Sequence, residues 1–107
     1  MKIFSSLMLL VLLRGVGVAG TIYGSIQVGG RPVNNGTIEI TLGDKKYQGR
    51  TDENGAYHIY VDRQGSCKLA ITSWDGQPYA DITSYGDPAR YDFELQRTSD
   101  RWVLVRR

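Results

Sequence analysis

His58 is the single histidine of the chain, and it limits the catalytic chemistry that the sequence can support. A nucleophilic site would need a serine or cysteine that this histidine activates, together with an acid that orients the histidine. No serine has the spacing of a nucleophile elbow. The alternation of Tyr57, His58 and Ile59 also places His58 on the outer face of a strand. We therefore expect a non-catalytic protein, with a small hydrolase that uses His58 as the less favoured alternative.

The segment from Asp52 to Gly55 gathers several oxygen ligands, which raises the question of a metal site. It lacks the acids at alternate positions and the closing glutamate of an EF-hand loop. A single histidine is also too few for an iron site. We expect no metal and no cofactor. The segment is instead predicted to be a structural turn in which Asp52, Asn54 and Gly55 reverse the chain and Tyr57 enters the core.

Exposed aromatic residues with polar neighbours provide the best candidate binding surface. One group lies in the irregular segment that follows Thr72, and a second group lies on the outer face of the strand around His58. Such side chains stack on sugar rings or anchor protein interfaces. Trp74 and Tyr79 could instead fold over the edge of the core. The candidate binding residues are Trp74, Tyr79, Tyr85, Tyr60 and His58.

Apolar and polar residues alternate with a period of two through most of the chain, and this pattern predicts strands separated by Gly-, Asn- and Asp-containing turns. No segment shows a sustained helical period. The predicted fold is an all-β, antiparallel sandwich of seven or eight strands. The predicted strands cover residues 21–28, 37–42, 45–51, 56–61, 67–72, 80–84, 89–96 and 101–106.

Residues 1–19 have the three parts of a secretory signal: Lys2, the apolar run 7–13, and small residues at 16–20. The apolar run is shorter than the roughly 20 residues that span a bilayer. We expect cleavage after Ala19 or Gly20, no membrane span after cleavage, and a periplasmic or secreted protein. Residues 20–107 are then expected to form one domain.

The charge balance and the cysteine count narrow the possible partners. Two of the 13 basic residues lie in the leader, so 11 remain against 11 acidic residues, and we expect no binding to nucleic acid. Cys67 is the only cysteine, which excludes an intramolecular disulfide. Its alternation with Leu69 and Ile71 predicts a core position, and a thiol that bridges to a partner is the alternative.

Several motifs resemble the carboxypeptidase regulatory-like domains. They are Gly24-Ser25-Ile26, Gly30-Arg31-Pro32-Val33, Gly36-Thr37-Ile38, the segment from Thr51 to Tyr57, and Gly65-Ser66-Cys67-Lys68-Leu69. The resemblance covers residues 21–72 and implies a transthyretin-like sandwich. It also implies an accessory module for folding, adhesion or binding, without a catalytic set of its own. A hydroxyisourate hydrolase of this fold would carry several histidines and a Tyr-Arg-Gly-Ser end, whereas this chain ends Leu104-Val105-Arg106-Arg107.

The expected function is therefore an exported, non-catalytic module of binding or structural type. Its partner is expected to be another exported or envelope protein, or a glycan. A glycan-binding module that uses the aromatic residues from Trp74 to Tyr85 is one alternative. Another is a subunit completed by strand addition at an open sheet edge, either the strand at 45–51 or the last strand.

Overall fold

The structure is a computed structural model that describes residues 20–107, and every regular element in this range is a strand. The leader expected at residues 1–19 lies outside the described residues. Within residues 20–107, no helix is long and apolar enough to cross a membrane. The strands are β1 (Thr21–Val28), β2 (Arg31–Pro32), β3 (Thr37–Leu42), β4 (Lys45–Arg50), β5 (Ala56–Tyr60), β6 (Gly65–Ile71), β7 (Tyr79–Ser84), β8 (Ala89–Arg90), β9 (Phe93–Arg97) and β10 (Trp102–Arg106).

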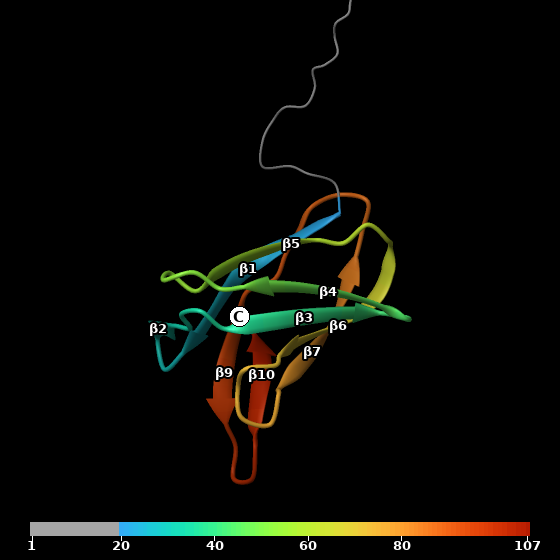
Figure 1. Cartoon of the computed structure of the whole chain (residues 1–107). Coiled ribbons are helices and arrows are strands. Elements are labelled where there is room, and N and C mark those ends of the chain that lie inside the picture. Colours follow the sequence, from blue (N-terminus) through green and yellow to red (C-terminus); the bar gives the residue numbers. More distant parts are fainter. Residues whose placement is uncertain (1–19) are drawn as a thin grey trace, which may run out of the picture.

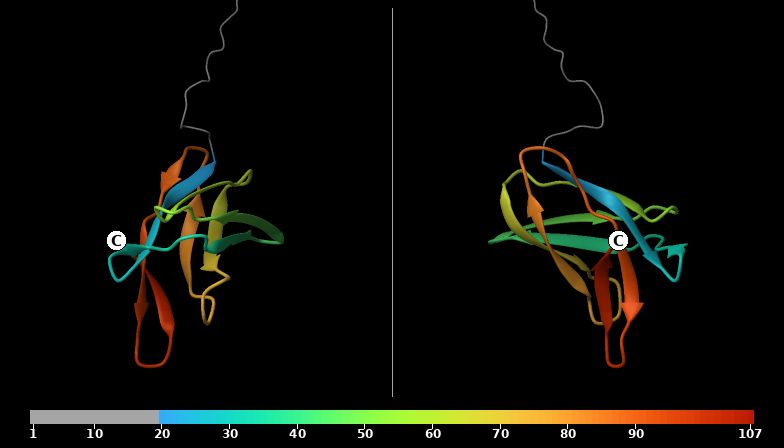
Figure 2. Two further views of the ribbon diagram at one scale, coloured as in Figure 1. Left: turned by 60° about the vertical axis from the view of Figure 1, so that its left-hand side comes forward. Right: turned by 180° about the vertical axis from the view of Figure 1, so that it is seen from behind.

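These strands form two sheets that pack face to face (Figure 1). The first sheet has the order β10-β9-β1-β2, and β5 and β8 also pair with β1. The second sheet has the order β4-β3-β6-β7. In the left view of Figure 2 the blue and red strands of the first sheet lie to one side of the green, yellow and light orange strands of the second. The predicted all-β class is confirmed, and its two sheets form the layers of a sandwich.

β1 is the central strand of the first sheet. One of its edges pairs with β5 along residues 21–25 and with β2 at residues 27–28, both antiparallel. Its other edge pairs with β8 and β9, and here the strands run parallel. The prediction of an entirely antiparallel sandwich is wrong at this pairing. Strand direction in a pair is set by how distant segments meet, and the local alternation of residues carries no information about it.

The strand expected at residues 89–96 is divided into β8 and β9, with Tyr91 and Asp92 between them. Both pieces keep one register against β1, since Ile22 lies opposite Ala89 and Ile26 lies opposite Phe93. β2 has only two residues and was not predicted, because so short a strand shows no alternation. The other expected strands are present, with ends that differ by one or two residues.

The core fills the space between the sheets with alternate residues from each. Tyr57, Tyr91, Phe93 and Leu95 are buried as the alternation predicts, and Cys67 is a free thiol buried in the same cluster. Close packing of branched side chains from both layers is the main stabilising contribution in such a sandwich. The largest completely buried apolar side chains are Phe93, Ile22, Ile26, Ile38, Ile40, Leu69, Ile71 and Val61.

The turn that precedes β5 has the geometry expected of a capped reversal. Oδ1 of Asp52 accepts hydrogen bonds from the amides of Asn54 at 2.8 Å and Ala56 at 3.0 Å. Gly55 has a φ of 76°, and a Cβ there would lie 2.5 Å from the carbonyl oxygen of Ile26. Only glycine meets both conditions. The turn therefore delivers Tyr57 into the core and places His58 on the outside.

Candidate functional site

The five predicted binding residues do not lie together. His58 and Tyr60 are exposed on β5, at the outer face of the first sheet, as the alternation predicts. Tyr79 and Tyr85 are each 55% exposed, but they belong to β7 of the second sheet and to the loop that follows it. Because the outer faces of two packed sheets point in opposite directions, His58 and Tyr79 cannot share a single flat ligand.

Trp74 is partly buried and packs against the core. Its ring meets that of Trp102 edge to face, with centroids 5.3 Å apart and an interplanar angle of 88°. The indole Nε1 is buried without a hydrogen-bond partner among residues 20–107. This arrangement agrees with the alternative in which Trp74 covers the edge of the core. Tyr79 differs, since it stays exposed with the ammonium of Lys68 4.7 Å from its ring centroid.

A row of three outward side chains crosses the first sheet at the level of Tyr23. Tyr23 lies opposite His58 of β5 on one side and opposite Arg90 of β8 on the other. Directly opposite residues in a sheet have Cβ atoms about 4.5–5.5 Å apart, so the three side chains are close neighbours. Tyr60 lies opposite Thr21, two residues from His58 on the same face of β5. We call Tyr23, His58, Tyr60 and Arg90 the outer-face row.

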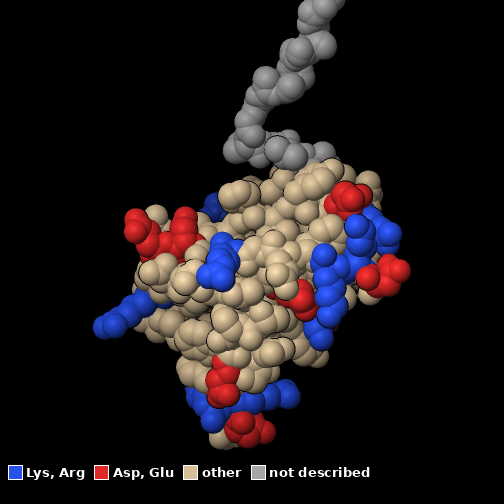
Figure 3. Space-filling model, viewed as in Figure 1, with Lys and Arg blue, Asp and Glu red and all other residues tan. Residues whose placement is uncertain are grey.

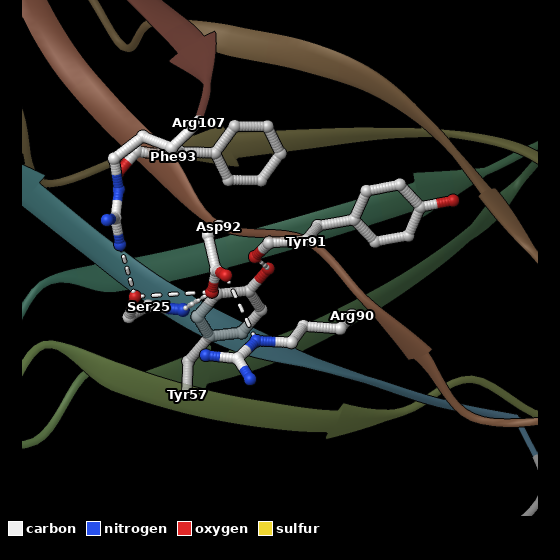
Figure 4. A network of polar contacts seen from close by, with 7 residues as sticks. All are labelled: Ser25, Tyr57, Arg90, Tyr91, Asp92, Phe93 and Arg107. Atoms are coloured by element: carbon white, nitrogen blue, oxygen red, sulfur yellow. Dashed lines mark hydrogen bonds and ion pairs between the residues drawn. The ribbon is translucent and has the colours of Figure 1, made fainter.

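A polar network supports Arg90 from the side (Figure 4). The Nε of Arg90 donates to Oδ2 of Asp92 at 3.0 Å, and Oδ1 of Asp92 accepts from the amide of Ser25 at 2.9 Å and from its hydroxyl at 3.2 Å. Nη2 of Arg107 donates to Oγ of Ser25 at 2.7 Å. In Figure 4 the rings of Tyr91 and Phe93 point away from this network. Both carboxylate oxygens of Asp92 therefore accept hydrogen bonds, Oδ1 from Ser25 of β1 and Oδ2 from Arg90.

The break between β8 and β9 explains why Asp92 takes this position. A Cβ at Gly24 would lie 1.9 Å from the carbonyl oxygen of Tyr91, so the two backbones approach closely at this point. The same carbonyl accepts a 2.7 Å hydrogen bond from the buried hydroxyl of Tyr57. The backbone pairing of β1 with β8 and β9 is interrupted here. The side chain of Asp92 replaces a backbone carbonyl as the acceptor for the amide of Ser25.

The other side chains with reactive groups are not arranged for catalysis or metal binding within residues 20–107. Among residues 20–107, His58 makes no hydrogen bond or ion pair with a serine, a cysteine or an acid, and no group of three His, Cys, Asp or Glu side chains is placed to hold a metal. Burial raises the pKa of the Cys67 thiol, which lowers its reactivity. Burial likewise raises the pKa of Tyr57.

The outer face of the second sheet has polar contacts of its own. Glu39 receives the ammonium of Lys46 at 3.8 Å and the amide of Gln48 at 3.3 Å. Figure 3 shows acidic and basic side chains interspersed over the side of the molecule that carries β3 and β4. In the outer-face row, neither Nη of Arg90 has a hydrogen-bond partner among residues 20–107.

Sequence reasoning found His58 and Tyr60 but did not single out Tyr23, Arg90, Asp92 or Ser25. What was lacking was the register that brings residues 58, 23 and 90 side by side, because its two pairings join residues that are 35 and 67 positions apart in the sequence.

Comparison of the chain with protein-family models, with curated proteins and with solved structures finds no match.

Proposed function

We propose that this protein is an exported, non-catalytic module that binds a partner through the outer-face row of its first sheet. The observation that carries the proposal is the alignment of His58, Tyr23 and Arg90 in one register across three strands. Tyr60 adds a further exposed ring, since 57% of it is accessible. Exposed aromatic rings beside a charged planar group are typical of binding surfaces.

The non-catalytic part of the proposal rests on how the polar residues are used. Asp52 caps a turn, Asp92 and Ser25 join β1 to the segment between β8 and β9, and Cys67 is buried. None of these side chains is paired with His58 in the way that general-base catalysis needs. Export rests on the sequence of residues 1–19 alone.

The membership that we propose is the carboxypeptidase regulatory-like group of transthyretin-like sandwiches. Its support is the sequence resemblance over residues 21–72 together with the two-sheet architecture. The turn from Thr51 to Tyr57, the most specific of the shared motifs, has the capped geometry that an architectural motif would require.

A binding screen against exported proteins and glycans tests the proposed surface. Tyr23→Ala should weaken the interactions that the screen detects, whereas Tyr79→Ala on the opposite sheet should leave them unchanged. Both residues are exposed, so both variants should fold. The reverse pattern would move the site to the alternative surface around Tyr79 and Tyr85, and turnover that His58→Ala abolishes would replace the binding module with an enzyme.

A further inference from the structure

We infer that the outer-face row recognises an acidic saccharide, with a sugar carboxylate on Arg90 and a pyranose ring on Tyr23 or Tyr60. This inference rests on the proposed function and specifies its ligand class. It is carried by the state of the Arg90 guanidinium, the accessibility of the two tyrosine rings, and the charge around them.

Arg90 is exposed yet oriented. Its side chain is 64% accessible, and Asp92 holds the Nε at 3.0 Å. Neither Nη has a hydrogen-bond partner among residues 20–107. A guanidinium held through Nε keeps a donor at each Nη, and a planar carboxylate can accept from such donors in a charge-assisted hydrogen bond. Fixing the side chain in advance also reduces the entropy lost when the ligand binds.

The aromatic residues supply the second half of the recognition. Tyr23 is 39% exposed and lies directly opposite Arg90. Tyr60 is 57% exposed and lies on the neighbouring strand β5, two residues from His58. The apolar C–H face of a pyranose packs against such rings. His58 lies opposite Tyr23 and two residues from Tyr60, and it can donate a hydrogen bond to a sugar hydroxyl or accept one from it. The row therefore matches a ligand that combines a flat apolar face, hydroxyl groups and a carboxylate.

The charges on this face favour a carboxylate at the Arg90 end. Asp92 is paired with Arg90 and accepts hydrogen bonds from the amide and hydroxyl of Ser25, and Arg107 adds a second cation next to Ser25. Glu94 lies on the same face but further along, opposite Gln27 and Val105 rather than Tyr23. An anionic ligand is therefore attracted to Arg90 and discouraged from extending over Glu94.

Three small probes separate the possible ligand classes by calorimetry with the purified protein. Trigalacturonate carries both the rings and the carboxylates, its methyl ester keeps the rings without the charge, and triglutamate keeps the carboxylates without the rings. The inference predicts binding of trigalacturonate, with affinity at least about tenfold weaker for each of the other two, the size expected when one charge-assisted hydrogen bond is lost.

Variants locate the site and separate charge from geometry. Arg90→Gln should weaken trigalacturonate binding about tenfold, Arg90→Lys should restore only part of this loss, and Tyr23→Ala should weaken binding of the methyl ester as well. Arg97→Gln and Tyr79→Ala serve as controls and should bind normally. Thermal melts establish that each variant is folded.

The outcomes decide the inference separately from the proposed function. Equal binding of triglutamate would indicate an acidic peptide ligand, and equal binding of the methyl ester would indicate a neutral glycan. Either result overturns the acidic saccharide, as does full affinity in Arg90→Gln or no binding of trigalacturonate. The proposed surface survives these failures if Tyr23→Ala still removes an interaction found in the binding screen, and it fails with them if Tyr23→Ala changes nothing.

Discussion

At the scale of single residues, two tyrosine side chains stabilise the fold through both their rings and their hydroxyl groups. Tyr57 is 3% exposed, and its hydroxyl donates to the carbonyl of Tyr91 at 2.7 Å. Tyr47 is half-buried, and its hydroxyl donates to Asp62 at 2.6 Å. Each phenol thus combines an apolar body with one oriented hydrogen bond, as is usual for tyrosine in small sandwiches.

Two substitutions at Tyr57 separate its ring from its hydroxyl. Tyr57→Phe leaves the Tyr91 carbonyl without its donor and should cost about 1–3 kcal/mol of unfolding free energy. Tyr57→Ala also removes the buried ring and should cost about 3–5 kcal/mol. Urea unfolding measures both. If Tyr57→Phe matched the parent protein, the hydroxyl would have no structural role, and if Tyr57→Ala also matched it, the inward face of β5 would be misassigned.

The contact between Tyr47 and Asp62 predicts a dependence of stability on pH. The hydrogen bond from Tyr47 holds the pKa of the Asp62 carboxyl below its ordinary value of 3.8, and the same bond raises the pKa of Tyr47 above 10.0. The contact therefore stabilises the fold between these two values, and its contribution is lost as pH falls through the folded pKa of Asp62 or rises through that of Tyr47.

Tyr47→Phe tests this dependence. The variant should be slightly less stable than the parent at pH 7. The difference should shrink as the pH falls below about 4 and through the lowered folded pKa of Asp62, because only below that value is Asp62 protonated in the folded form of both proteins. Denaturant unfolding at a series of pH values gives the comparison. A difference that stays constant down to pH 2 would show that the ring, and not the hydrogen bond, is responsible.

At the scale of elements, the pairing of β1 with both β8 and β9 sets the shape of the first sheet. Alternation predicted β1 correctly, and it predicted one strand around Phe93 where the structure has β8 and β9, because each of these strands has one face in the core. It could not predict that they run in parallel, or that the backbone hydrogen bonds between them are interrupted opposite Gly24. Both features follow from a contact between distant segments. Sequence reasoning recovered the strands here but not their pairing.

Gly24 gives the sharpest test of this junction. Any side chain at position 24 would meet the Tyr91 carbonyl at 1.9 Å, so Gly24→Ala should prevent folding or lower the unfolding free energy by more than 3 kcal/mol, roughly the size of a severe single substitution. Gly29→Ala is the matched control. Its φ of 59° is also strained for alanine, but no atom lies within 4 Å of the added Cβ, and the expected cost is about 1–2 kcal/mol. Similar thermal melts for the two variants would disprove the close approach.

At the scale of the whole molecule, the sandwich separates the predicted aromatic residues onto opposite outer faces. His58 and Tyr60 stay with the first sheet, Tyr79 and Tyr85 with the second, and Trp74 packs against Trp102 at the edge between them. The sequence indicated which side chains face outward on regular strands. It could not indicate which of them become neighbours, because Tyr23 and Arg90 meet only through the register of three strands.

The central claim is that an acidic saccharide binds the outer face of the first sheet, and an NMR titration of the ¹⁵N-labelled protein with trigalacturonate tests it most directly. The predicted result is that the perturbed amides fall in residues 21–25, 56–60 and 89–92, the segments that carry the outer-face row. Perturbations centred on Tyr79 to Tyr85, or none in any strand, would contradict the claim.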